Sequence, residues 1–194
     1  DKVLIPRPDT ELIVDQVLKI YKNKHKINFL EIGVGSGCII LSILKEKEFF
    51  LGTGVDLSHD CIKICKKNAV RLRVENRLKL IKSDIDNLSS GKYDLIISNP
   101  PYVKKLDLRK LDKDVVNYEP KLALDGGIDG LSKIRKVIKK SSELVKLNGK
   151  LIIEIAHDQK KMVVKVLRDN GFFVNAVIKD LGKNDRCIVS TKKK

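Results

Sequence analysis

The sequence Asn99-Pro100-Pro101-Tyr102 combines an amide side chain, two prolines and an aromatic ring in four consecutive positions. It directly follows the apolar run Tyr93–Ser98, which is typical of a buried strand, so these residues form a turn at the strand's end. Each proline fixes its own φ near about −65° and lacks a backbone N–H donor. A flat NH2 group could therefore donate its two protons to Asn99 Oδ1 and the Pro100 carbonyl, with Tyr102 covering its face. The alternative is an ordinary Pro-Pro turn.

A glycine-rich segment, EIGVGSG at residues 31–37, joins a strand-like run to a helix-like run. It does not match the dinucleotide fingerprint G-x-G-x-x-G, because Cys38 stands where that pattern ends in glycine. Closely spaced glycines let a ligand approach the backbone, which side chains would otherwise obstruct. The segment therefore predicts a ligand site, with a plain tight turn as the alternative.

Two carboxylates follow the next strand-like runs. Asp56 ends the second run about 20 residues after the glycine segment, where doubly wound folds place an acidic residue that accepts from ribose hydroxyls. Asp84 ends the third run with Ile85 behind it, a pair placed to flank an adenine. The sequence has no Gly-Lys-Ser/Thr phosphate loop, which disfavours a triphosphate. Carboxylates without a phosphate-binding lysine suit an adenosine carried on a cationic sulfonium.

These groups are positioned by strand-like and helix-like runs that alternate along the chain. The expected strands cover residues 27–32, 51–56, 78–81, 93–98, 150–156, 173–179 and 186–191. Helices are expected after a cap at Asp9, over 38–44, after a cap at Ser58, over 131–147, and from a cap at Asp158 to Asn170-Gly171. Continuous apolar strands separated by helices predict a parallel sheet that is covered on both faces.

The last two expected strands have no helix between them, and the Gly-Lys-Asn-Asp turn that joins them suits a hairpin. We therefore predict an α/β, Rossmann-like fold with a mostly parallel seven-stranded sheet and an antiparallel C-terminal strand. Ligands of such sheets lie over the carboxyl ends of the strands. The glycine segment, Asp56, Asp84 and Asn99 all fall at that edge, and together they predict a class I methyltransferase. Residues 103–130 lack clear periodicity and are expected to form part of the substrate wall.

The chain's length and charge bound its organisation and partners. Its 194 residues are expected to form one domain, residues 1–194, and the first residue, Asp1 rather than Met, predicts that it belongs to a longer polypeptide. The 40 basic and 25 acidic residues give a net charge of +15, which suits a phosphate-bearing partner such as RNA. The basic residues are mostly lysines spread along the chain, so a solvated surface is the alternative to nucleic-acid contact.

Other residue types predict no further site. No apolar run approaches the roughly 18 residues that cross a bilayer, so no membrane partner is expected. The four cysteines show no CxxC pair or zinc-ligand spacing, so no metal is expected, and reduced thiols fit a cytoplasmic protein. His25, His59 and His157 have no paired carboxylate at a recognisable spacing, so no catalytic acid or base is assigned.

The sequence resembles the release-factor glutamine N5-methyltransferases of the HemK/PrmC family over nearly its whole length. The resemblance lies in IPRPDTE at 5–11, the glycine segment, VDLS at 55–58, SNPPY at 98–102, EPKLALDGG at 119–127, EIAHDQ at 154–159 and KDL at 179–181. The N-P-P-Y sequence alone is shared with adenine-N6 methyltransferases that act on nucleic acid. The segments at 5–11 and 119–127 point to the protein-methylating branch.

The resemblance implies transfer of a methyl group from S-adenosylmethionine to the glutamine side-chain nitrogen in the Gly-Gly-Gln motif of a class I peptide chain release factor, leaving S-adenosylhomocysteine. By position it implies cofactor contacts at Gly33, Val34, Gly35, Ser36, Gly37, Asp56, Ile85 and Asn99, to which Asp84 is added from its place in the sheet. It implies a substrate amide held by Asn99, Pro100, Pro101 and Tyr102, with Asn99, Pro100 and Tyr102 as the catalytic residues.

Two features depart from the family pattern. The small helical domain that usually precedes this segment does not occur within these 194 residues, and the first strand ends in Glu-Ile-Gly where Asp-Leu-Gly is commoner. A second hypothesis is a methyltransferase for an exocyclic amine of RNA or DNA, favoured by the charge and the shared N-P-P-Y. A third is a non-catalytic binding module that keeps the fold. The intact glycine segment and Asn99 argue against this third hypothesis.

Overall fold

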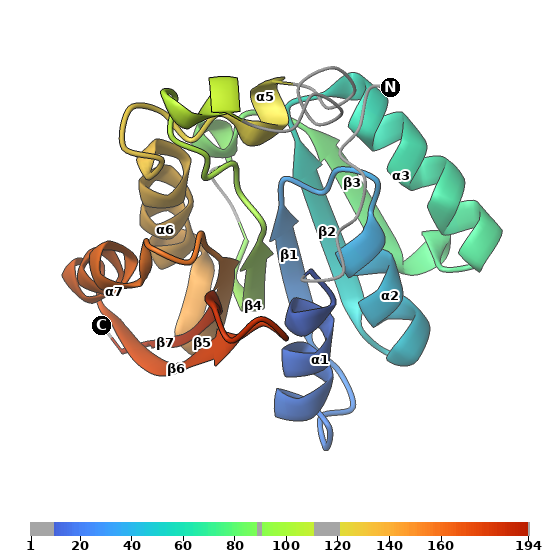
Figure 1. Cartoon of the computed structure of the whole chain (residues 1–194). Helices are drawn as coiled ribbons and strands as arrows, with labels where there is room; N and C mark the ends of the chain where they lie inside the picture. The colour runs from blue at the N-terminus through green and yellow to red at the C-terminus, as the bar shows by residue number, and fades with distance from the viewer. Residues whose placement is uncertain (1–9, 89–90, 111–120, 194) are drawn as a thin grey trace.

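The computed structural model describes residues 10–88, 91–110 and 121–193. Its centre is a seven-stranded sheet with the strand order β3-β2-β1-β4-β5-β7-β6 (Figure 1). The strands are β1 Asn28–Ile32, β2 Leu51–Asp56, β3 Leu78–Lys82, β4 Tyr93–Ser98, β5 Val145–Glu154, β6 Phe172–Lys179 and β7 Asp185–Lys192. Neighbouring strands are parallel except for the pairs that include β7, which runs antiparallel to both β5 and β6. The predicted α/β fold is confirmed.

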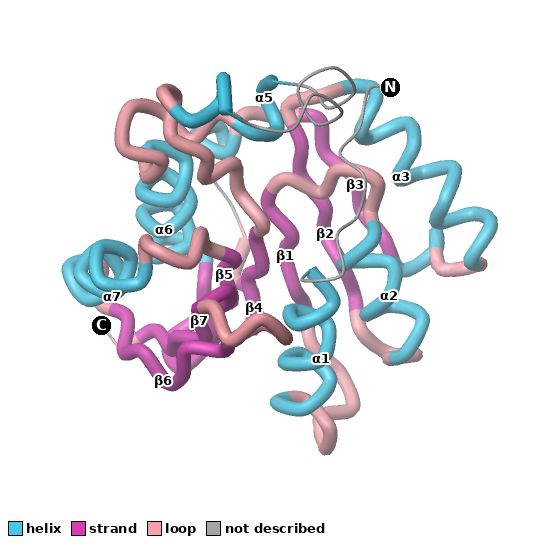
Figure 2. The backbone as a smooth tube through the Cα atoms, in the orientation of Figure 1, coloured by secondary structure: helices cyan, strands magenta, loops and turns pink. Residues whose placement is uncertain are grey.

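Helices cover both faces of the sheet. They are α1 Glu11–Ile20, α2 Cys38–Glu46, α3 His59–Leu72, α5 Lys121–Leu124, α6 Ser132–Leu144 and α7 Lys160–Asp169. One hydrophobic layer contains α1, α2 and α3, and the other contains α6 and α7 (Figures 1 and 2). In β4, Leu95 and Ile97 face the first layer and Ile96 the second, and all three are fully buried. A strand covered on both faces is apolar at every position, which explains the continuous apolar runs.

The largest difference in element boundaries lies between α6 and β5. The periodicity predicted a helix over 131–147 and a strand from 150, whereas β5 already begins at Val145. The β4–β5 register shifts within this stretch, so part of it bulges out of the ladder. Asn148 in the bulge has a φ of 62°, and a Cβ on Gly149 would lie 2.7 Å from Val145 Cγ2. Apolar residues spaced as in a helix therefore belong to a bulged strand.

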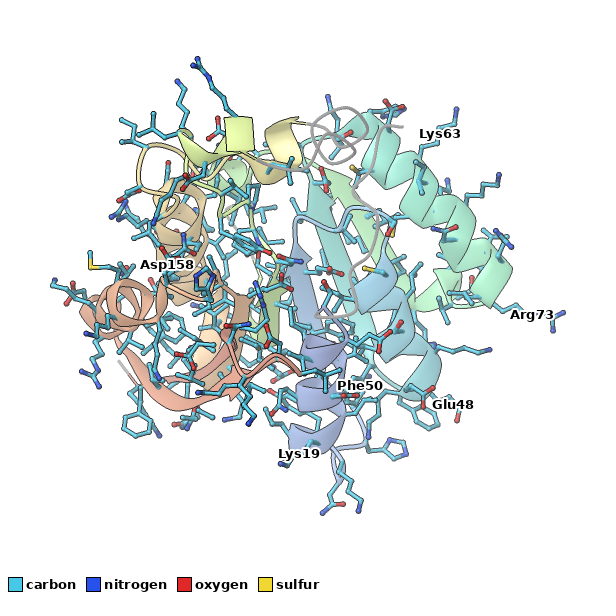
Figure 3. The ribbon with its side chains drawn as sticks, in the orientation of Figure 1. Lys19, Glu48, Phe50, Lys63, Arg73 and Asp158 are labelled. Carbon is cyan, nitrogen blue, oxygen red and sulfur yellow. The ribbon has the colours of Figure 1, made fainter. Side chains whose placement is uncertain are left out.

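The predicted helix caps have different outcomes. Ser58 caps α3 as predicted, because its Oγ accepts a backbone N–H of the first turn at 3.3 Å. The cap predicted at Asp9 lies outside the described residues. The cap predicted at Asp158 is wrong: the N-cap residue of α7 is Gln159, and the Asp158 carboxylate instead pairs with Lys104 Nζ at 2.6 Å. Figure 3 labels Asp158 near the start of α7.

The final hairpin extends the carboxyl edge of the sheet. Its turn is fixed by Asp180, which accepts from the Asn184 N–H at 2.9 Å and pairs with Arg186 at 3.0 Å. The start of β7 lies beside the end of β5, since Cys187 pairs with Glu154. The hairpin turn therefore lies at the edge where the parallel strands end. Among the helices of the described ranges, none is long and apolar enough to cross a membrane.

Candidate active site

A cavity of about 260 Å³ lies at the carboxyl edge of the sheet. Its walls come from the ends of β1, β2 and β4, from the loops after these strands and β3, and from α3, α5 and α6. The predicted site residues on its lining are Gly33, Gly35, Asp56, Asp84, Ile85, Asn99, Pro100 and Pro101. The other predicted residues, which the structure also describes, lie outside the lining: Val34, Ser36, Gly37 and Tyr102. The structure thus brings the glycine segment, both carboxylates and the N-P-P-Y turn to one cavity.

The glycine segment turns sharply because Gly33, Gly35 and Gly37 have positive φ angles of 77°, 53° and 85°. Gly33 leaves the space beside it open, since a Cβ built there would meet no atom within 4 Å. Gly37 is required for packing, since its Cβ would lie 2.5 Å from Cys65 Sγ. The segment therefore exposes backbone to the cavity at its start, while its end packs closely against α3.

Val34 and Ser36, which alternate with these glycines, do not line the cavity. The Val34 side chain is 2% exposed and belongs to the hydrophobic layer of α1, α2 and α3. The Ser36 carbonyl accepts from Asn68 Nδ2 of α3 at 3.0 Å. A buried valine offers a ligand its backbone only, so the contacts implied for these two residues stay predictions.

The carboxylate of Asp56, at the end of β2, is fixed by two backbone N–H groups. Oδ2 accepts from Gly35 N at 2.9 Å, and Oδ1 accepts from Ser58 N at 2.8 Å. A carboxylate has about four acceptor positions, so both oxygens can accept further bonds from the cavity side. The acceptor predicted for two ribose hydroxyls is therefore held in place by the backbone around it.

Glu31 of β1 supports the glycine segment through a bond to the helix that follows it. Its side chain is 1% exposed, and Oε2 accepts from the Ile40 N–H, in the first turn of α2, at 2.9 Å. The N-cap residue of α2 is Gly37, which has no side chain to satisfy that turn, so Glu31 does so from the neighbouring strand. Burial raises the pKa of the Glu31 carboxyl, and the negative charge of Asp56 adds to the rise. The acidic residue at this position therefore stabilises the fold of the loop.

Asp84 lies two residues beyond β3 and begins the short 3-10 helix Ile85–Asn87. Its Oδ1 pairs with Lys136 Nζ of α6 at 2.6 Å, and the same ammonium contacts Asp86 Oδ2 at 2.8 Å. The hydrogen bond from Lys136 lowers the pKa of the Asp84 carboxyl. Ile85 is 9% exposed and belongs to the hydrophobic layer of α6. Asp84 and Ile85 thus line the cavity where α6 meets the loop after β3.

Sequence reasoning missed two lysines of α6, Lys133 and Lys136, that also line the cavity. The interpretation of this site as carboxylates without a lysine therefore needs correction. The helical spacing over 131–147 was the one signal available, because the two lysines reach the site only when α6 packs on the sheet. Lys136 is held between the Asp84 and Asp86 carboxylates, so its charge is compensated within the protein.

The N-P-P-Y turn leaves β4 after Ser98, whose hydroxyl donates to the Ile32 carbonyl of β1 at 2.8 Å. Asn99 then donates from Nδ2 to Thr10 Oγ1 at 3.3 Å. Because the donor end of the amide is directed at Thr10, Oδ1 is the end that can accept from a ligand. This oxygen is the acceptor that sequence analysis assigned to a substrate NH2 group.

Tyr102 is fixed by contacts at its side chain and its backbone. The hydroxyl donates to Glu154 Oε1 at 3.2 Å, and the carbonyl accepts from Gln159 Nε2 at 3.0 Å. Gln159 Nε2 also donates to the Gly130 carbonyl at 3.2 Å, while its Oε1 accepts from the Ala156 N–H at 3.0 Å. One buried amide therefore connects the N-P-P-Y turn to the residues after β5 and to the loop before α6.

The described parts of residues 103–130 support the predicted substrate wall. The Val103 N–H donates to the Leu124 carbonyl at 3.0 Å, and the Gly126 N–H donates to the Val103 carbonyl at 2.9 Å. Ala123 of α5 lies on the cavity lining. These bonds hold α5 against the residues that follow the N-P-P-Y turn, and residues 111–120 lie outside the described ranges.

The chemistry of the lining fits an adenosine-containing cofactor. A fixed carboxylate suits ribose hydroxyls, and the side chains of Ile32, Val55, Ile85 and Val137 offer apolar surface for a flat base. Within the described ranges, no group of three or more His, Cys, Asp or Glu side chains could hold a metal ion. Cys61 also lines the cavity, and burial raises the pKa of its thiol.

Comparisons with known proteins place this chain in a family. Residues 9–128 match the family model described as "Methyltransferase small domain". The release factor glutamine methyltransferase of Caulobacter vibrioides is 37% identical over 191 residues, which cover 98% of this chain and 66% of that protein. For the proteins of the same name from Fusobacterium nucleatum and Clostridium acetobutylicum the identities are 38% and 35%, again over 98% of this chain, with 54% and 68% of the relative covered.

Among solved structures, the ribosomal protein L11 methylase from Lactobacillus delbrueckii subsp. bulgaricus has a TM-score of 0.72 at 15% identity, covering 99% of this chain and 82% of that chain. At this identity the similarity shows the fold alone. The chain belongs to the methyltransferase small domain family. Within it, the chain is a member of the HemK/PrmC family, whose relatives carry the name release factor glutamine methyltransferase. It spans between 54% and 68% of the length of the three relatives.

Proposed function

We propose that this chain transfers a methyl group from S-adenosylmethionine to the side-chain nitrogen of the glutamine in the Gly-Gly-Gln motif of a class I peptide chain release factor. The observation that carries the proposal is the orientation of Asn99. Its donor end contacts Thr10, so its Oδ1 is available to a substrate NH2 group at the cavity lining. Membership of the HemK/PrmC family supports the same substrate.

The cavity supports S-adenosylmethionine as the methyl donor. Asp56 would accept from the ribose hydroxyls, and Asp84 and Ile85 would flank the adenine. The backbone at Gly33 and Gly35 would let the rest of the cofactor approach the sheet edge. Bound S-adenosylmethionine supplies a methyl group on a positively charged sulfur and leaves as S-adenosylhomocysteine.

The N-P-P-Y turn supplies what an amide nucleophile lacks. An amide nitrogen is a poor nucleophile because its lone pair is delocalised into the carbonyl. Asn99 Oδ1 and the Pro100 carbonyl would each accept a hydrogen bond from one of its N–H groups. These bonds raise the electron density on the nitrogen and favour a pyramidal geometry. The two prolines fix these acceptors, so they stabilise the developing positive charge without reorganising. Holding the nitrogen in line with the methyl group raises the effective concentration of the two reactants. The proton that the nitrogen releases after transfer passes to water.

Transfer of a labelled methyl group tests this function. We expect label on an isolated class I release factor, and no label when the glutamine of its Gly-Gly-Gln motif is replaced by alanine. Label on RNA or DNA, with none on the release factor, would instead support a methyltransferase for an exocyclic amine. Binding of S-adenosylmethionine without transfer to either partner would support the non-catalytic binding module.

The charge favours nucleic acid as the second candidate substrate. The chain carries a net charge of +15, and Lys63 of α3 and Arg73, which follows α3, point outward from the molecule (Figure 3). Such charges suit phosphate groups, and the N-P-P-Y turn could hold an exocyclic amine as well as an amide. We place the release factor first because the segments at 5–11 and 119–127 resemble the protein-methylating branch and the relatives carry the name release factor glutamine methyltransferase. We propose the cytoplasm, where thiols stay reduced, as the location.

A further inference from the structure

A buried carboxylate connects the two ends of the N-P-P-Y turn. Glu154, the last residue of β5, is 2% exposed. Its Oε1 accepts from the Tyr102 hydroxyl at 3.2 Å, and its Oε2 accepts from the Thr10 hydroxyl at 3.3 Å. Thr10 Oγ1 in turn accepts from Asn99 Nδ2 at 3.3 Å. Side chains from the start of α1, the turn and β5 therefore form one continuous series of hydrogen bonds.

Glu154 sets the direction of every donor in this series. A carboxylate only accepts hydrogen bonds, so Thr10 uses its single proton toward Oε2. The Thr10 oxygen can then only accept on its Asn99 side, and Nδ2 is the only donor of the Asn99 side chain. The reversed Asn99 amide would place two acceptor oxygens, Oδ1 and Oγ1, against each other.

Thr10 does not play the part that its position in α1 would suggest. It is the N-cap residue, where a threonine hydroxyl commonly accepts a backbone N–H of the first turn, but it makes no side-chain cap hydrogen bond. The residue is 6% exposed. A buried hydroxyl that bonds to Glu154 and Asn99 instead of the helix serves the turn.

We propose that Thr10 and Glu154 are positioning residues that hold the Asn99 amide with Oδ1 toward the substrate nitrogen. The inference rests on the proposed function, in which Oδ1 accepts from a glutamine NH2 group. A reversed amide would present the N–H donors of Asn99 to the N–H donors of the substrate, and the nitrogen would not be oriented. The same carboxylate holds the Tyr102 hydroxyl, so Glu154 fixes both ends of the turn.

The orientation of Asn99 can be measured by NMR of the 15N-labelled protein without any substrate. We expect one proton of the Asn99 NH2 group to be protected from exchange with water by Thr10. Thr10→Val keeps the side-chain shape without the hydroxyl and should abolish this protection, whereas Thr10→Ser should keep it. An Asn99 NH2 group that does not respond to Thr10→Val would overturn the proposal.

A matched control makes the same change at the opposite edge of the sheet. Thr191 in β7 is 5% exposed, bonds to Asn175 Oδ1 at 2.6 Å, and pairs with Lys150 far from the end of β5. Thr191→Val should leave the Asn99 resonances unchanged. A response as large as that of Thr10→Val would show that any lost buried hydroxyl disturbs the turn, and would overturn the proposal.

Glu154→Gln tests the direction of the series with little change of shape. A glutamine amide can donate to the Thr10 oxygen, which would allow the Thr10 proton to turn toward Asn99 Oδ1. We therefore expect the protection of the Asn99 NH2 group to fall in Glu154→Gln as in Thr10→Val. Full protection in a folded Glu154→Gln variant would show that the carboxylate does not determine the direction of these hydrogen bonds, and would overturn the role proposed for Glu154.

Kinetics connect the orientation to catalysis. Thr10→Val and Glu154→Gln should each lower kcat on a release factor by about 10- to 100-fold, because small misplacements of reacting groups cost up to about that much. Cofactor affinity should change by less than about twofold, since the Asp56 and glycine contacts remain, and Thr10→Ser should restore most of kcat. The double variant should lose no more than the worse single variant, because both act through Asn99. Normal kcat in Thr10→Val would overturn the positioning role.

The NMR comparison and the methylation assay together separate this inference from the proposed function. Absence of release-factor methylation by the unmodified protein would refute the proposed function alone, because the NMR comparison still confirms or refutes the orientation of Asn99. Methylation together with an unresponsive Asn99 NH2 group would refute the inference alone.

Discussion

Two halves of the cavity, the cofactor half and the substrate half of the proposed function, are built in different ways. In the cofactor half, Asp56 and Gly35 lie 21 positions apart and are joined by a bond from backbone to side chain. Behind the substrate half, the supporting residues Thr10 and Glu154 lie 144 positions apart and are joined by a bond between their side chains. The first half is therefore recognisable from local spacing, whereas the second depends on contacts that form only in the folded chain.

This difference predicts that substitutions in the two halves affect different steps. Backbone N–H groups hold the Asp56 carboxylate from two sides, so it stays in place when distant side chains change. Among the described residues, the Thr10 hydroxyl, which is itself bonded to the Glu154 carboxylate, holds the Asn99 amide. Cofactor binding should therefore tolerate changes in the substrate half, while turnover should not.

The largest effect is expected from Asn99→Ala, which removes the acceptor itself. We expect kcat on a release factor to fall by at least about 100-fold, comparable to the loss of one preorganised hydrogen-bonding group in other active sites. Affinity for S-adenosylmethionine, measured by calorimetry, should fall much less, because the ribose and adenine contacts remain. The variant should fold, because a half-buried residue at the exposed end of a strand contributes little packing.

Two further variants sharpen this prediction. Asn99→Asp keeps the size and an acceptor oxygen but places a negative charge beside the substrate amide, so it should also lower kcat. Asn76→Ala, the same change at an exposed position, should leave kcat unchanged. Near-normal turnover by Asn99→Ala would mean that the N-P-P-Y turn is only structural, and the comparison of the two halves would fail.

Asp56→Ala should have the next largest effect, on binding rather than turnover. The ribose hydroxyls would lose a charged acceptor worth about 1.5–3 kcal/mol per bond, so cofactor affinity should fall by a few kcal/mol. Asp169→Ala removes an exposed carboxylate of α7 and is the control. Calorimetric titration with S-adenosylmethionine distinguishes them, and an unchanged affinity in Asp56→Ala would remove this residue from the site.

The site residues show what a sequence can predict. Gly33, Gly35 and Asp56 were correctly placed at one cavity because residues at the carboxyl ends of parallel strands share one edge, and Asn99 because its turn follows a strand. Lys136 was missed because it reaches the cavity from α6, 52 positions from its partner Asp84. No spacing rule joins a lysine on a later helix to a loop after an earlier strand.

Thr10 and Glu154 were present in the segments at 5–11 and 154–159, but their chemistry was not predictable. Glu154 comes at the end of an apolar strand, where a buried carboxylate needs partners. Two of its partners, Thr10 and Tyr102, come from the N-cap of α1 and from the turn. The sequence alone gives no register between these elements, so the hydrogen bonds could not be assigned from it.

The fold was more predictable than the contacts within it. Strands Leu51–Asp56 and Tyr93–Ser98 were predicted to the residue, and Tyr93–Ser98 is an apolar run that the N-P-P-Y turn ends. The start of β5 was missed, because the bulge at Asn148 breaks the strand pattern. The α7 cap was misassigned, because Asp158 has a tertiary partner, Lys104, that competes with the helix for its carboxylate.

Glu31→Gln tests whether the cofactor half depends on its buried carboxylate, and its effect is on stability. Burial raises the pKa of Glu31 in the folded protein above its unfolded value. Between these two pKa values the folded state binds more protons, so the stability that this group contributes falls as pH rises, by up to about 1.4 kcal/mol per pH unit. The glutamine side chain of the variant would not titrate and could still accept from the Ile40 N–H.

The free energy of unfolding, measured by urea at several pH values, should therefore increase in the Glu31→Gln variant relative to the unmodified protein as pH rises. Glu48→Gln, on an exposed glutamate at the surface (Figure 3), is the matched control and should show no such trend. A pH-independent difference between Glu31→Gln and the unmodified protein would contradict the raised pKa of Glu31.

The smallest effect is expected from the positive surface of α3, which neither half of the site uses. Lys63, Lys66 and Lys67 are exposed, and Lys63 points away from the molecule (Figure 3). If the substrate is a free protein loop, changing all three to glutamine should alter activity on an isolated release factor by less than about threefold. Activity should also fall only modestly between low and physiological salt, since few counterions are released.

A control of equal charge shows whether any salt dependence belongs to α3. Lys19, Lys22 and Lys24, exposed at the far end of α1, provide the matched triple change to glutamine. A steep log–log salt dependence that the α3 variant flattens and the α1 variant does not would indicate phosphate contacts, because each neutralised phosphate contributes a slope of about −0.7 to −0.9. That result would favour a nucleic-acid substrate, for which the N-P-P-Y turn would hold an exocyclic amine of a base instead of a glutamine amide.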